Sequence, residues 1–367
     1  MLPLNSTTAS PILSRSSAQA DLAAYRDGPR RILIVTDAWE PQVNGVVRTL
    51  KAVAVELTAM GHRVRFATPQ NEMTVPLPTY PQVRLALFPR HGIQRTLEDF
   101  APDAIHIATE GTMGLSARRL CLQKGFRFST SFHTHFPEYV HARFPWIPQR
   151  VIYGALRKFH TAASATMVAT TVLQKELEQR GFTNLALWPR GVDIGLFAPA
   201  ARKRFDRLGL GITRPLFLYV GRLAVEKNVE AFLALDLPGT KLVVGDGPQR
   251  AELERRFPKA VFIGERTDRE LAALYAASDV FVFPSRTDTF GLVLLEALAC
   301  GTPIAAYPVN GALDILDKTP VAALAEDLRT ACLAALAIPR TTCREFAQVR
   351  SWRKSAEQFL GSLTSVS

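Results

Sequence analysis

The sequence predicts two α/β domains of the Rossmann type, each built on a parallel sheet. The first observation is the length, because 367 residues are more than one hydrophobic core usually organises. The second is that short apolar runs rich in β-branched residues alternate with stretches of helical pattern, as parallel strands do. The third is that glycine-containing loops follow these runs, where open α/β sheets bind their ligands.

The chain divides into a short leading segment and two domains of similar size. Residues 1–28 are rich in Ser, Ala and Thr and lack the apolar core of a secretory signal, so we expect a mobile N-terminal segment. The first domain is expected over residues 29–190 and the second over residues 191–349. No apolar run approaches the roughly 18 residues that a membrane-spanning helix needs.

The first domain opens with a strand–loop–helix–strand pattern. Residues 31–37 form an apolar strand, a helix follows to about Met60, Gly61 ends it, and residues 62–68 form the next strand. The intervening loop holds Asn44 and Gly45, which would let the backbone approach a ligand closely at a helix N-terminus. An ordinary turn is the alternative interpretation.

Two more strands of the first domain are expected, over residues 100–109 and 126–132, with a helix reaching Lys124 between them. His133 and His135 follow the later strand. A His-x-His pair can bind a metal, but no third ligand lies near it in the sequence, so we expect no metal. A hydrogen-bonded core histidine is the alternative for His133.

Residues 136–158 mix aromatic side chains with cations, as in Tyr139, Trp146, Arg150 and Arg157. Aromatic anchors beside positive charges suit the headgroup region of an anionic membrane. Pro145 and Pro148 exclude one continuous amphipathic helix. A helix packed on its own domain with a basic outer face explains the pattern equally well.

The second domain repeats the alternation with strands at 216–220, at 240–244 and at 260–264. Arg222 and Lys227 follow the first of these, on a loop that leads into a helix. Two cations beside a helix N-terminus favour a diphosphate site, although two solvated surface cations are the alternative. Gly-rich turns follow the next two strands, at Gly245 and Gly264.

A buried strand at 279–283 precedes the most informative stretch, residues 284–303. We expect Asp288 or Thr289 to cap a helix from about Phe290 to Ala299. Glu296 is the one charge in this apolar helix, and a buried carboxylate is costly unless something pairs with it. It would therefore bind ligand hydroxyls or, as the alternative, a neighbouring backbone group or arginine.

The charge and the cysteine content of the sequence limit the classes of partner and the cellular compartment that we expect. The formal net charge is +11, with most of the surplus in residues 1–200, which suggests that the first half meets an anionic surface. No nucleic-acid-binding motif is present, so we expect no nucleic-acid partner. The four cysteines lack metal-ligand spacing and indicate reduced thiols in the cytoplasm.

Residues 285–301 resemble the acidic E-x7-E signature of family 4 retaining glycosyltransferases, with Asp288 in place of the first Glu. Residues 221–228 are similar to that family's G-R-L-x-x-E-K-N segment. The Asp variant resembles the branch of bacterial lipid glycosyltransferases, sulfoquinovosyl-diacylglycerol synthases and GDP-mannose-dependent mannosyltransferases. The resemblance implies the GT-B fold, in which two Rossmann-like domains face each other across a cleft. It also implies that residues 350–367 form a helix that returns to the first domain.

The resemblance also assigns roles to residues. It places the acceptor on the first domain and the nucleotide sugar on the second. Its donor-binding positions are Asn44, Gly45, Gly221, Gly245, Gly264, Arg266, Thr289, Phe290, Gly291 and Glu296, with Glu296 on the ribose. Its catalytic positions are His133 and Asp288 near the donor sugar and Arg222 and Lys227 on the diphosphate. No cofactor and no metal are implied, and the chain contains no Asp-x-Asp.

The expected function is retaining transfer of a hexose-type sugar from a UDP- or GDP-linked donor to a membrane lipid such as diacylglycerol. The expected location is the cytoplasm, peripherally on the inner face of the cell membrane. A glycosyltransferase for soluble or oligosaccharide acceptors is one alternative, and a non-catalytic nucleotide-sugar-binding module is another. A dinucleotide-dependent oxidoreductase is disfavoured, because no G-x-G-x-x-G fingerprint is present.

Overall fold

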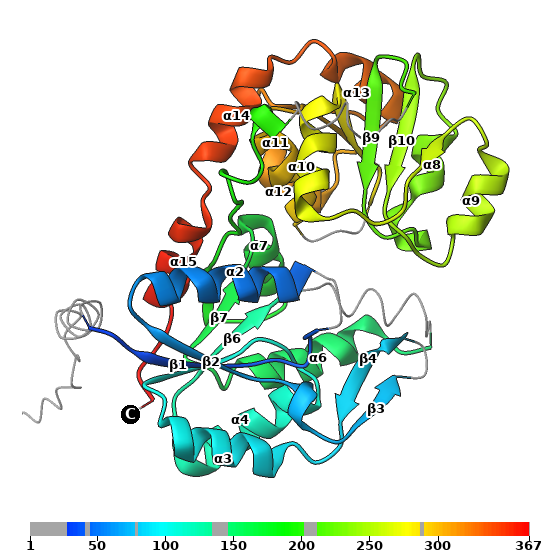
Figure 1. The fold of residues 1–367 in the computed structure, drawn as a ribbon. Coiled ribbons are helices and arrows are strands. Elements are labelled where there is room, and N and C mark those ends of the chain that lie inside the picture. Colours follow the sequence, from blue (N-terminus) through cyan, green and yellow to red (C-terminus); the bar gives the residue numbers. More distant parts are fainter. Residues whose placement is uncertain are drawn as a thin grey trace, which may run out of the picture.

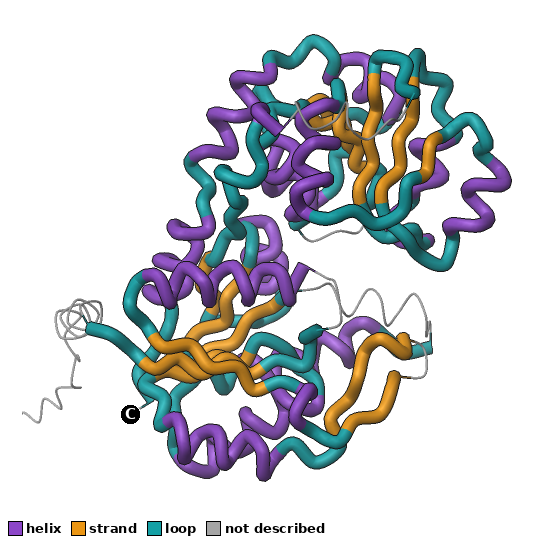
Figure 2. The backbone as a smooth tube through the Cα atoms, in the orientation of Figure 1, coloured by secondary structure: helices purple, strands orange, loops and turns teal. Residues whose placement is uncertain are grey.

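The computed structural model describes residues 28–40, 45–77, 80–133, 146–201, 211–286 and 290–366. It contains two α/β domains, one above the other in Figure 1, each with strands in the middle and helices on both sides (Figure 2). The two-domain α/β prediction is therefore confirmed. Of the expected mobile segment, all but Gly28 lies outside the described residues.

The first domain is built on a six-stranded parallel sheet in the order β2-β1-β5-β6-β7-β8. Its strands are β1 (Arg31–Val35), β2 (Arg63–Ala67), β5 (Ala104–Ile107), β6 (Ser129–Phe132), β7 (Ala165–Val168) and β8 (Leu185–Leu187). Strand β1 has both faces buried, as its unbroken apolar run requires. Ile32 and Ile34 pack into one layer of the core, whereas Leu33 and Val35 pack into the other.

The helices of the first domain cover both faces of this sheet. They are α2 (Gly45–Ala59), α3 (Arg90–Phe100), α4 (Thr112–Lys124), α6 (Gln149–His160) and α7 (Thr171–Gln179), beside a 3₁₀ turn η1 (Pro69–Asn71) and a hairpin of β3 (Thr74–Leu77) and β4 (Tyr80–Ala86). The buried Asp37 accepts hydrogen bonds from the backbone N–H groups of Met113 (2.8 Å) and Gly114 (3.3 Å). It thus fixes the start of α4 to the end of β1.

The second domain repeats the plan with the sheet order β11-β10-β9-β12-β13-β14, again parallel. Its strands are β9 (Leu216–Val220), β10 (Thr240–Val244), β11 (Val261–Phe262), β12 (Val280–Phe283), β13 (Ile304–Ala306) and β14 (Ala322–Leu324). Its helices are α8 (Val229–Leu233), α9 (Arg250–Arg256), α10 (Asp268–Ala277), α11 (Leu292–Ala299), α12 (Asn310–Leu316), α13 (Leu328–Ala335) and α14 (Arg340–Gln348), with a 3₁₀ turn η3 (Val225–Lys227).

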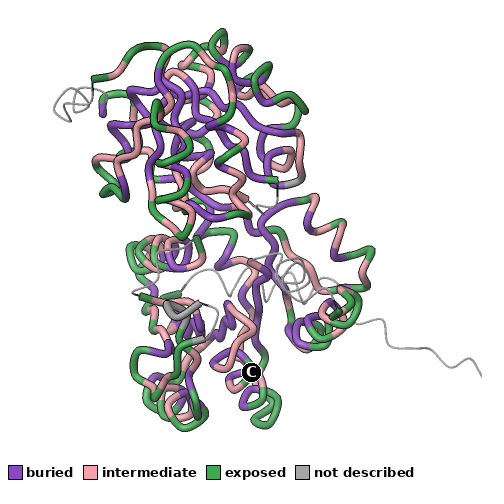
Figure 3. Tube along the Cα trace, turned by 90° about the vertical axis from the view of Figure 1, so that its right-hand side faces the viewer, coloured by how far each residue is buried: buried purple, intermediate pink, exposed green. Residues whose placement is uncertain are grey.

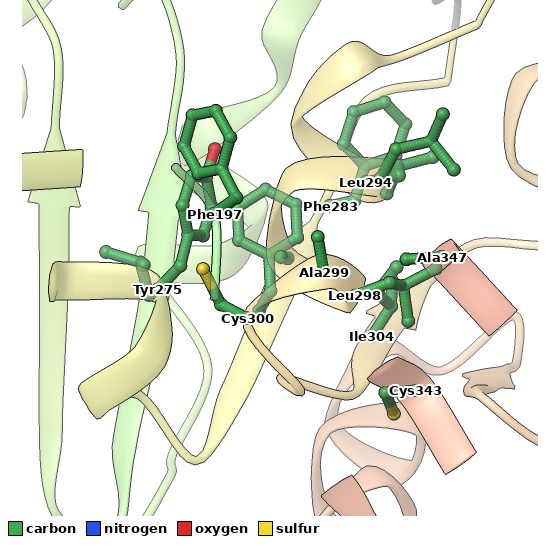
Figure 4. Close-up of a cluster of buried hydrophobic side chains, with 14 of the residues drawn as sticks. Phe197, Tyr275, Phe283, Leu294, Leu298, Ala299, Cys300, Ile304, Cys343 and Ala347 are labelled. Atoms are coloured by element: carbon green, nitrogen blue, oxygen red, sulfur yellow. The ribbon is translucent and has the colours of Figure 1, made fainter. Parts of the chain in front are cut away.

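The core of the second domain lies beside α10 and α11, and buried residues run through the middle of both domains (Figure 3). Tyr275 of α10 packs against Phe197, with ring centroids 6.0 Å apart (Figure 4). Cys300, which ends α11, is buried in the same cluster. All four cysteines are free and buried.

The chain ends on the first domain, as the resemblance implied. Helix α15 (Trp352–Gly361) packs beside α2, and its Phe359 and Leu360 enter the core layer that holds Ile32 and Ile34 (Figure 1). Val366 then donates its backbone N–H to the carbonyl of Asp103 (3.0 Å). The last helix therefore belongs physically to the first domain.

Candidate functional site

The strand order of the second sheet identifies a binding edge. Strands β9 and β12 are neighbours, but the chain leaves β9 in one direction across the sheet and β12 in the other. Ligands of open α/β sheets bind at such a reversal, beyond the carboxyl ends of the strands. The loop with Arg222 and Lys227 follows β9, and the loop that begins at Pro284 follows β12.

Hydrogen bonds join these two loops. The Asn228 side-chain amide donates to the carbonyl of Pro284 (3.1 Å), and the Ser285 hydroxyl donates to the carbonyl of Glu226 (3.4 Å). Asn228 takes a left-handed conformation with φ of 53°, which ends the 3₁₀ turn and begins α8. The predicted cationic loop and the predicted acidic segment thus lie side by side.

The glycines that follow β9, β10 and β11 come together at the same edge. Gly245 has a φ of 132°, and a Cβ built on it would lie 2.0 Å from the carbonyl oxygen of Gly221. Its N–H donates to the carbonyl of Gly264 (2.9 Å). Only glycine permits this close approach, so the three turns pack together at this edge, and their role in binding the donor stays a prediction.

The cations at this edge reach toward solvent. Arg222 is exposed and Lys227 is partly exposed, and the Tyr219 hydroxyl donates to the carbonyl of Arg222 (2.9 Å). Arg266 is also exposed, just after Gly264. Positive charges on short, tethered loops beside a helix start are suited to an anionic group such as a diphosphate.

Glu296 lies in the middle of α11 and is only 4% exposed. Its Oε2 accepts a hydrogen bond from the Tyr275 hydroxyl (3.1 Å), and its Oε1 pairs with Nη2 of Arg48 (2.9 Å). Burial raises the pKa of the Glu296 carboxyl, and the Arg48 guanidinium opposes that shift. Arg48 belongs to α2, so this ion pair joins the two domains.

The start of α11 differs from the prediction. The helix begins at Leu292 rather than at Phe290, and its N-cap is Gly291, with a φ of 68°. Gly291 can adopt this left-handed conformation because it has no Cβ, so the cap lies beyond Asp288 and Thr289. The expectation that one of those two residues caps the helix was therefore wrong. Both lie outside the described residues, whereas Phe290 packs against the core of the second domain.

The glycine loop of the first domain meets this region from the other side. A Cβ built on Gly45, the first residue of α2, would lie 3.9 Å from Cδ1 of Leu292. The starts of α2 and α11 are thus in contact across the domain boundary. Asn44 lies outside the described residues. A further contact joins the domains where the Val172 N–H donates to Oδ1 of Asp314 (3.2 Å).

His133 is the predicted site residue that lies deepest in the first domain, at the end of β6. Its Nδ1 lies 3.0 Å from Nη2 of Arg190, and its Nε2 lies 2.8 Å from Oγ of Ser131. Because a guanidinium can only donate, Nδ1 accepts and the proton resides on Nε2. The bonds continue from Ser131 to His106 (3.0 Å) and from His106 to Ser129 (2.9 Å).

The electrostatics of this chain of hydrogen bonds keep its imidazoles neutral. Burial, followed by the Arg190 guanidinium, holds the pKa of His133 well below its usual range. The same causes lower the pKa of His106 from 6.5 to about 3. Burial also lowers the pKa of Arg190 to about 9, and its guanidinium lies 4.1 Å from the centroid of the Trp188 ring.

Sequence reasoning missed three residues of this arrangement, namely Arg48, Tyr275 and Arg190. Arg48 and Tyr275 sit in helices with no local signal, and Arg190 lies in a segment to which no site role was assigned. Their importance arises from contacts between segments far apart in the chain. The single available signal was Glu296 itself, because a buried carboxylate requires partners.

Two kinds of feature are absent from the part of the chain that the structure describes. No group of three or more His, Cys, Asp or Glu side chains there could hold a metal ion. No helix there is long and apolar enough to cross a membrane. His135, the second histidine of the His-x-His pair, lies outside the described residues.

Comparison with family models gives two matches that together span both domains. Residues 43–196 match the model described as Glycosyltransferase Family 4. Residues 214–338 match the model described as Glycosyl transferases group 1. The first match begins just before α2 and the second includes both acidic and cationic loops of the candidate site.

Comparison with individual proteins gives long alignments. A GDP-mannose-dependent alpha-mannosyltransferase of Mycobacterium tuberculosis is 31% identical over 306 residues, which cover 78% of this chain and 81% of that protein. An alpha-monoglucosyldiacylglycerol synthase of Streptococcus pneumoniae is 26% identical, with coverage of 75% and 71%. Among solved structures, a sucrose-phosphate synthase from Thermosynechococcus elongatus is similar with a TM-score of 0.72 and 22% identity, covering 90% of this chain and 97% of that one.

Proposed function

Because the chain belongs to family 4 of the glycosyltransferases and has the GT-B fold, we propose that it moves a hexose-type sugar from a UDP- or GDP-linked donor to a membrane lipid, with retention at the anomeric carbon. Sugar transfer from a nucleotide sugar is the activity of the family. The observation that carries the proposal is the buried carboxylate of Glu296 in α11, the helix that follows β12 at the sheet edge where the strand order reverses.

The donor is proposed to lie along this edge. Glu296 accepts hydrogen bonds from the ribose hydroxyls, and the backbone near Gly264 and Arg266 reads the base. Arg222 and Lys227 bind the diphosphate, on loops that pack closely because Gly221 and Gly245 lack side chains. The sugar is assigned to residues 288–291 of the second domain and to residues 44–45 and His133 of the first.

The proposed chemistry needs stabilisation of a nucleoside diphosphate leaving group. Two preorganised cations stabilise the charge that develops on it, and we propose that they do so without a metal. His133 is not assigned as a base or nucleophile, since Arg190 and Ser131 engage both of its ring nitrogens. Its proposed role is to line the pocket of the donor sugar in a fixed, neutral form.

A lipid acceptor is supported by the surface of the first domain. Before and along α6, Trp146 is 74% exposed and Val151 is 58% exposed. Arg150, Arg157 and Lys158 are exposed in the same segment, which therefore presents apolar side chains and positive charge to solvent. Residues 136–145 of the predicted membrane-facing stretch lie outside the described residues. The lipid-acting relative named above also favours diacylglycerol or a related lipid.

The proposed location follows from the same surface. A basic, aromatic face would hold the protein peripherally on the anionic inner face of the cell membrane, in the cytoplasm. A soluble or oligosaccharide acceptor remains the second candidate. It is favoured by the mixture of lipid-named and other relatives that align with this chain.

The acceptor and donor can be identified in one experiment. Purified protein is offered a panel of UDP- and GDP-sugars together with anionic liposomes that contain diacylglycerol, and the lipids are resolved by mass spectrometry. A new glycolipid with one donor is the expected result. Donor hydrolysis without glycolipid would reject the lipid acceptor, and bound nucleotide without turnover would support the non-catalytic binding module.

The diphosphate role of Lys227 is tested by Lys227→Ala. Loss of its charge is expected to lower turnover by about 10²–10³-fold, because an electrostatic contact to the leaving group is lost. Lys259→Ala, at an exposed lysine between α9 and β11, is the matched control and is expected to keep wild-type turnover. Wild-type turnover in Lys227→Ala would exclude the assigned role.

A further inference from the structure

Arg48 and Glu296 form an ion pair between the two domains at the proposed ribose site. The Arg48 guanidinium lies 2.9 Å from Oε1 of Glu296 and 3.3 Å from Oδ1 of Asp268, at the start of α10. The Glu296 side chain is 6% exposed, the Arg48 side chain 33% and the Asp268 side chain 61%. In Figure 1, α2 runs along the side of the first domain that faces the second.

In this arrangement both carboxylate oxygens of Glu296, which a ribose would need as acceptors, are already hydrogen-bonded or ion-paired. Oε1 of Glu296 is engaged by Arg48, and Oε2 accepts from the Tyr275 hydroxyl (3.1 Å). Tyr275 is wholly buried, so its hydroxyl cannot turn to solvent. Arg48 is the more exposed of the two partners and therefore the one that a ligand can displace.

A ribose could displace Arg48 because both present hydrogen-bond donors to a carboxylate. The 2′- and 3′-hydroxyls of a ribose are neutral donors at adjacent carbons, and a carboxylate can accept hydrogen bonds from both. A guanidinium presents paired N–H donors in a similar planar fork. Arg48 reaches Glu296 through one such donor, from Nη2 to Oε1 (2.9 Å), and so takes an oxygen that a ribose hydroxyl would need.

We propose, on the basis of the donor role assigned to Glu296 above, that Arg48 is a built-in competitor for the ribose diol and so sets the nucleotide affinity. In the unliganded protein it occupies Glu296 and holds the first domain against the second. A nucleotide that brings a 2′,3′-diol must exchange with it. A nucleotide without the diol leaves the ion pair intact.

The exchange also links nucleotide binding to the domain interface. Once the diol occupies Glu296, the cross-domain ion pair is broken and Arg48 keeps only its exposed contact with Asp268. The freed cation then remains in the first turn of α2, the helix that begins at Gly45. Nucleotide binding is therefore expected to change the separation of the domains.

The test compares nucleotides with and without the diol. Dissociation constants of UDP, GDP and their 2′,3′-dideoxy counterparts are measured by calorimetry on the full chain and on Arg48→Met. The expected result is that the preference for the diol over the dideoxy form rises about tenfold in Arg48→Met, since the competitor is gone. Using this ratio cancels any contact between Arg48 and the diphosphate, which both nucleotides carry.

Three further variants make the test specific. Lys51→Met removes another cation of α2, one that pairs with Glu40 of the same domain, and is expected to leave the ratio unchanged. Glu296→Gln is expected to reduce the diol preference, because the carboxylate is lost. If Arg48→Met does not fold, Arg48→Gln replaces it, since glutamine keeps a polar contact while the charge is removed.

The outcomes separate this inference from the proposed function. A ratio in Arg48→Met within twofold of the wild-type ratio would overturn the inference while leaving nucleotide binding intact. Absence of nucleoside diphosphate binding in both wild type and variant would overturn the donor site and the inference together. Small-angle X-ray scattering of the unliganded proteins gives a second readout, with a larger radius of gyration expected for Arg48→Met than for Lys51→Met.

Discussion

His133 is a polar side chain whose properties are set by a residue that lies 57 positions away in the sequence. Arg190 donates to its Nδ1, so one tautomer is fixed and the ring orientation is fixed with it. The sequence predicted that His133 lies at a strand end near the site, and it left a core histidine as the alternative. In the structure His133 follows the end of β6, is partly buried and has both ring nitrogens hydrogen-bonded, so its role near the donor stays a prediction.

At the same scale, Arg190→Met should change the protonation of His133. The variant removes both the donor to Nδ1 and the positive charge that helps to hold the His133 pKa low, so that pKa is expected to rise. Nitrogen-detected NMR of the imidazoles across pH measures the tautomer and the pKa. The free energy of unfolding is also expected to fall by about 1–3 kcal/mol, because buried hydrogen bonds are lost.

Arg118→Met provides the matched control, since Arg118 is another arginine that donates to backbone carbonyls in the first domain. It is expected to leave the His133 resonances in place. An unchanged His133 tautomer and pKa in Arg190→Met would show that Arg190 does not position this ring.

At the scale of elements, the carboxyl ends of β9, β10 and β11 depend on backbone contacts that exclude side chains. Gly245→Ala would place a methyl group 2.0 Å from the carbonyl oxygen of Gly221. The loops must then separate, and the residue must also keep a φ of 132°, so we expect a loss of about 1–3 kcal/mol in the free energy of unfolding. Urea unfolding measures this loss, and nucleotide titration is expected to show weaker binding.

Gly154→Ala is expected to raise the free energy of unfolding, in contrast to Gly245→Ala. Gly154 lies within α6 and a Cβ there would meet nothing within 4 Å, so alanine should stabilise the protein by up to about 1 kcal/mol. Equal effects of the two substitutions would refute the argument that the close approach at Gly245 matters.

The same elements show what local sequence can predict. Strands β1 and β12 follow from apolar runs, and the end of α4 at Lys124 lies where the sequence predicted it, because these signals act over a few neighbouring residues. The start of α11 was misplaced by two residues, because Asp288 and Thr289 look like caps and the left-handed conformation of Gly291 leaves no local sign. The roles of Arg222 and Lys227 remain predictions, although the loop that carries them lies where it was expected.

At the scale of the whole molecule, the contacts between the domains were beyond the reach of local patterns. The Arg48–Glu296 pair and the bond from Val172 to Asp314 join residues from different domains, and no periodicity or spacing relates them. The sequence indicated that Glu296 needs a partner and left open whether that partner is a ligand or an arginine. In the structure it is an arginine, and the competition proposed above follows if the ribose binds the same carboxylate.

The stability of the whole molecule should fall on mild acidification, and His106 is the best-defined cause. Its pKa is lowered from 6.5 to about 3 in the folded protein, so the unfolded chain binds more protons between these values. Stability is therefore fully present above pH 6.5 and is lost as the pH falls toward 3, by up to about 1.4 kcal/mol per pH unit for this group. The lowered pKa of His133 changes stability in the same direction, whereas the raised pKa of Glu296 changes it in the opposite direction at lower pH.

Urea unfolding at pH 7 and pH 5 measures this loss of stability. The difference in the free energy of unfolding between the two pH values is expected to be smaller in His106→Gln than in the wild type, and exposed His91→Gln is the control. An equal difference in all three proteins would exclude His106 as the titrating group.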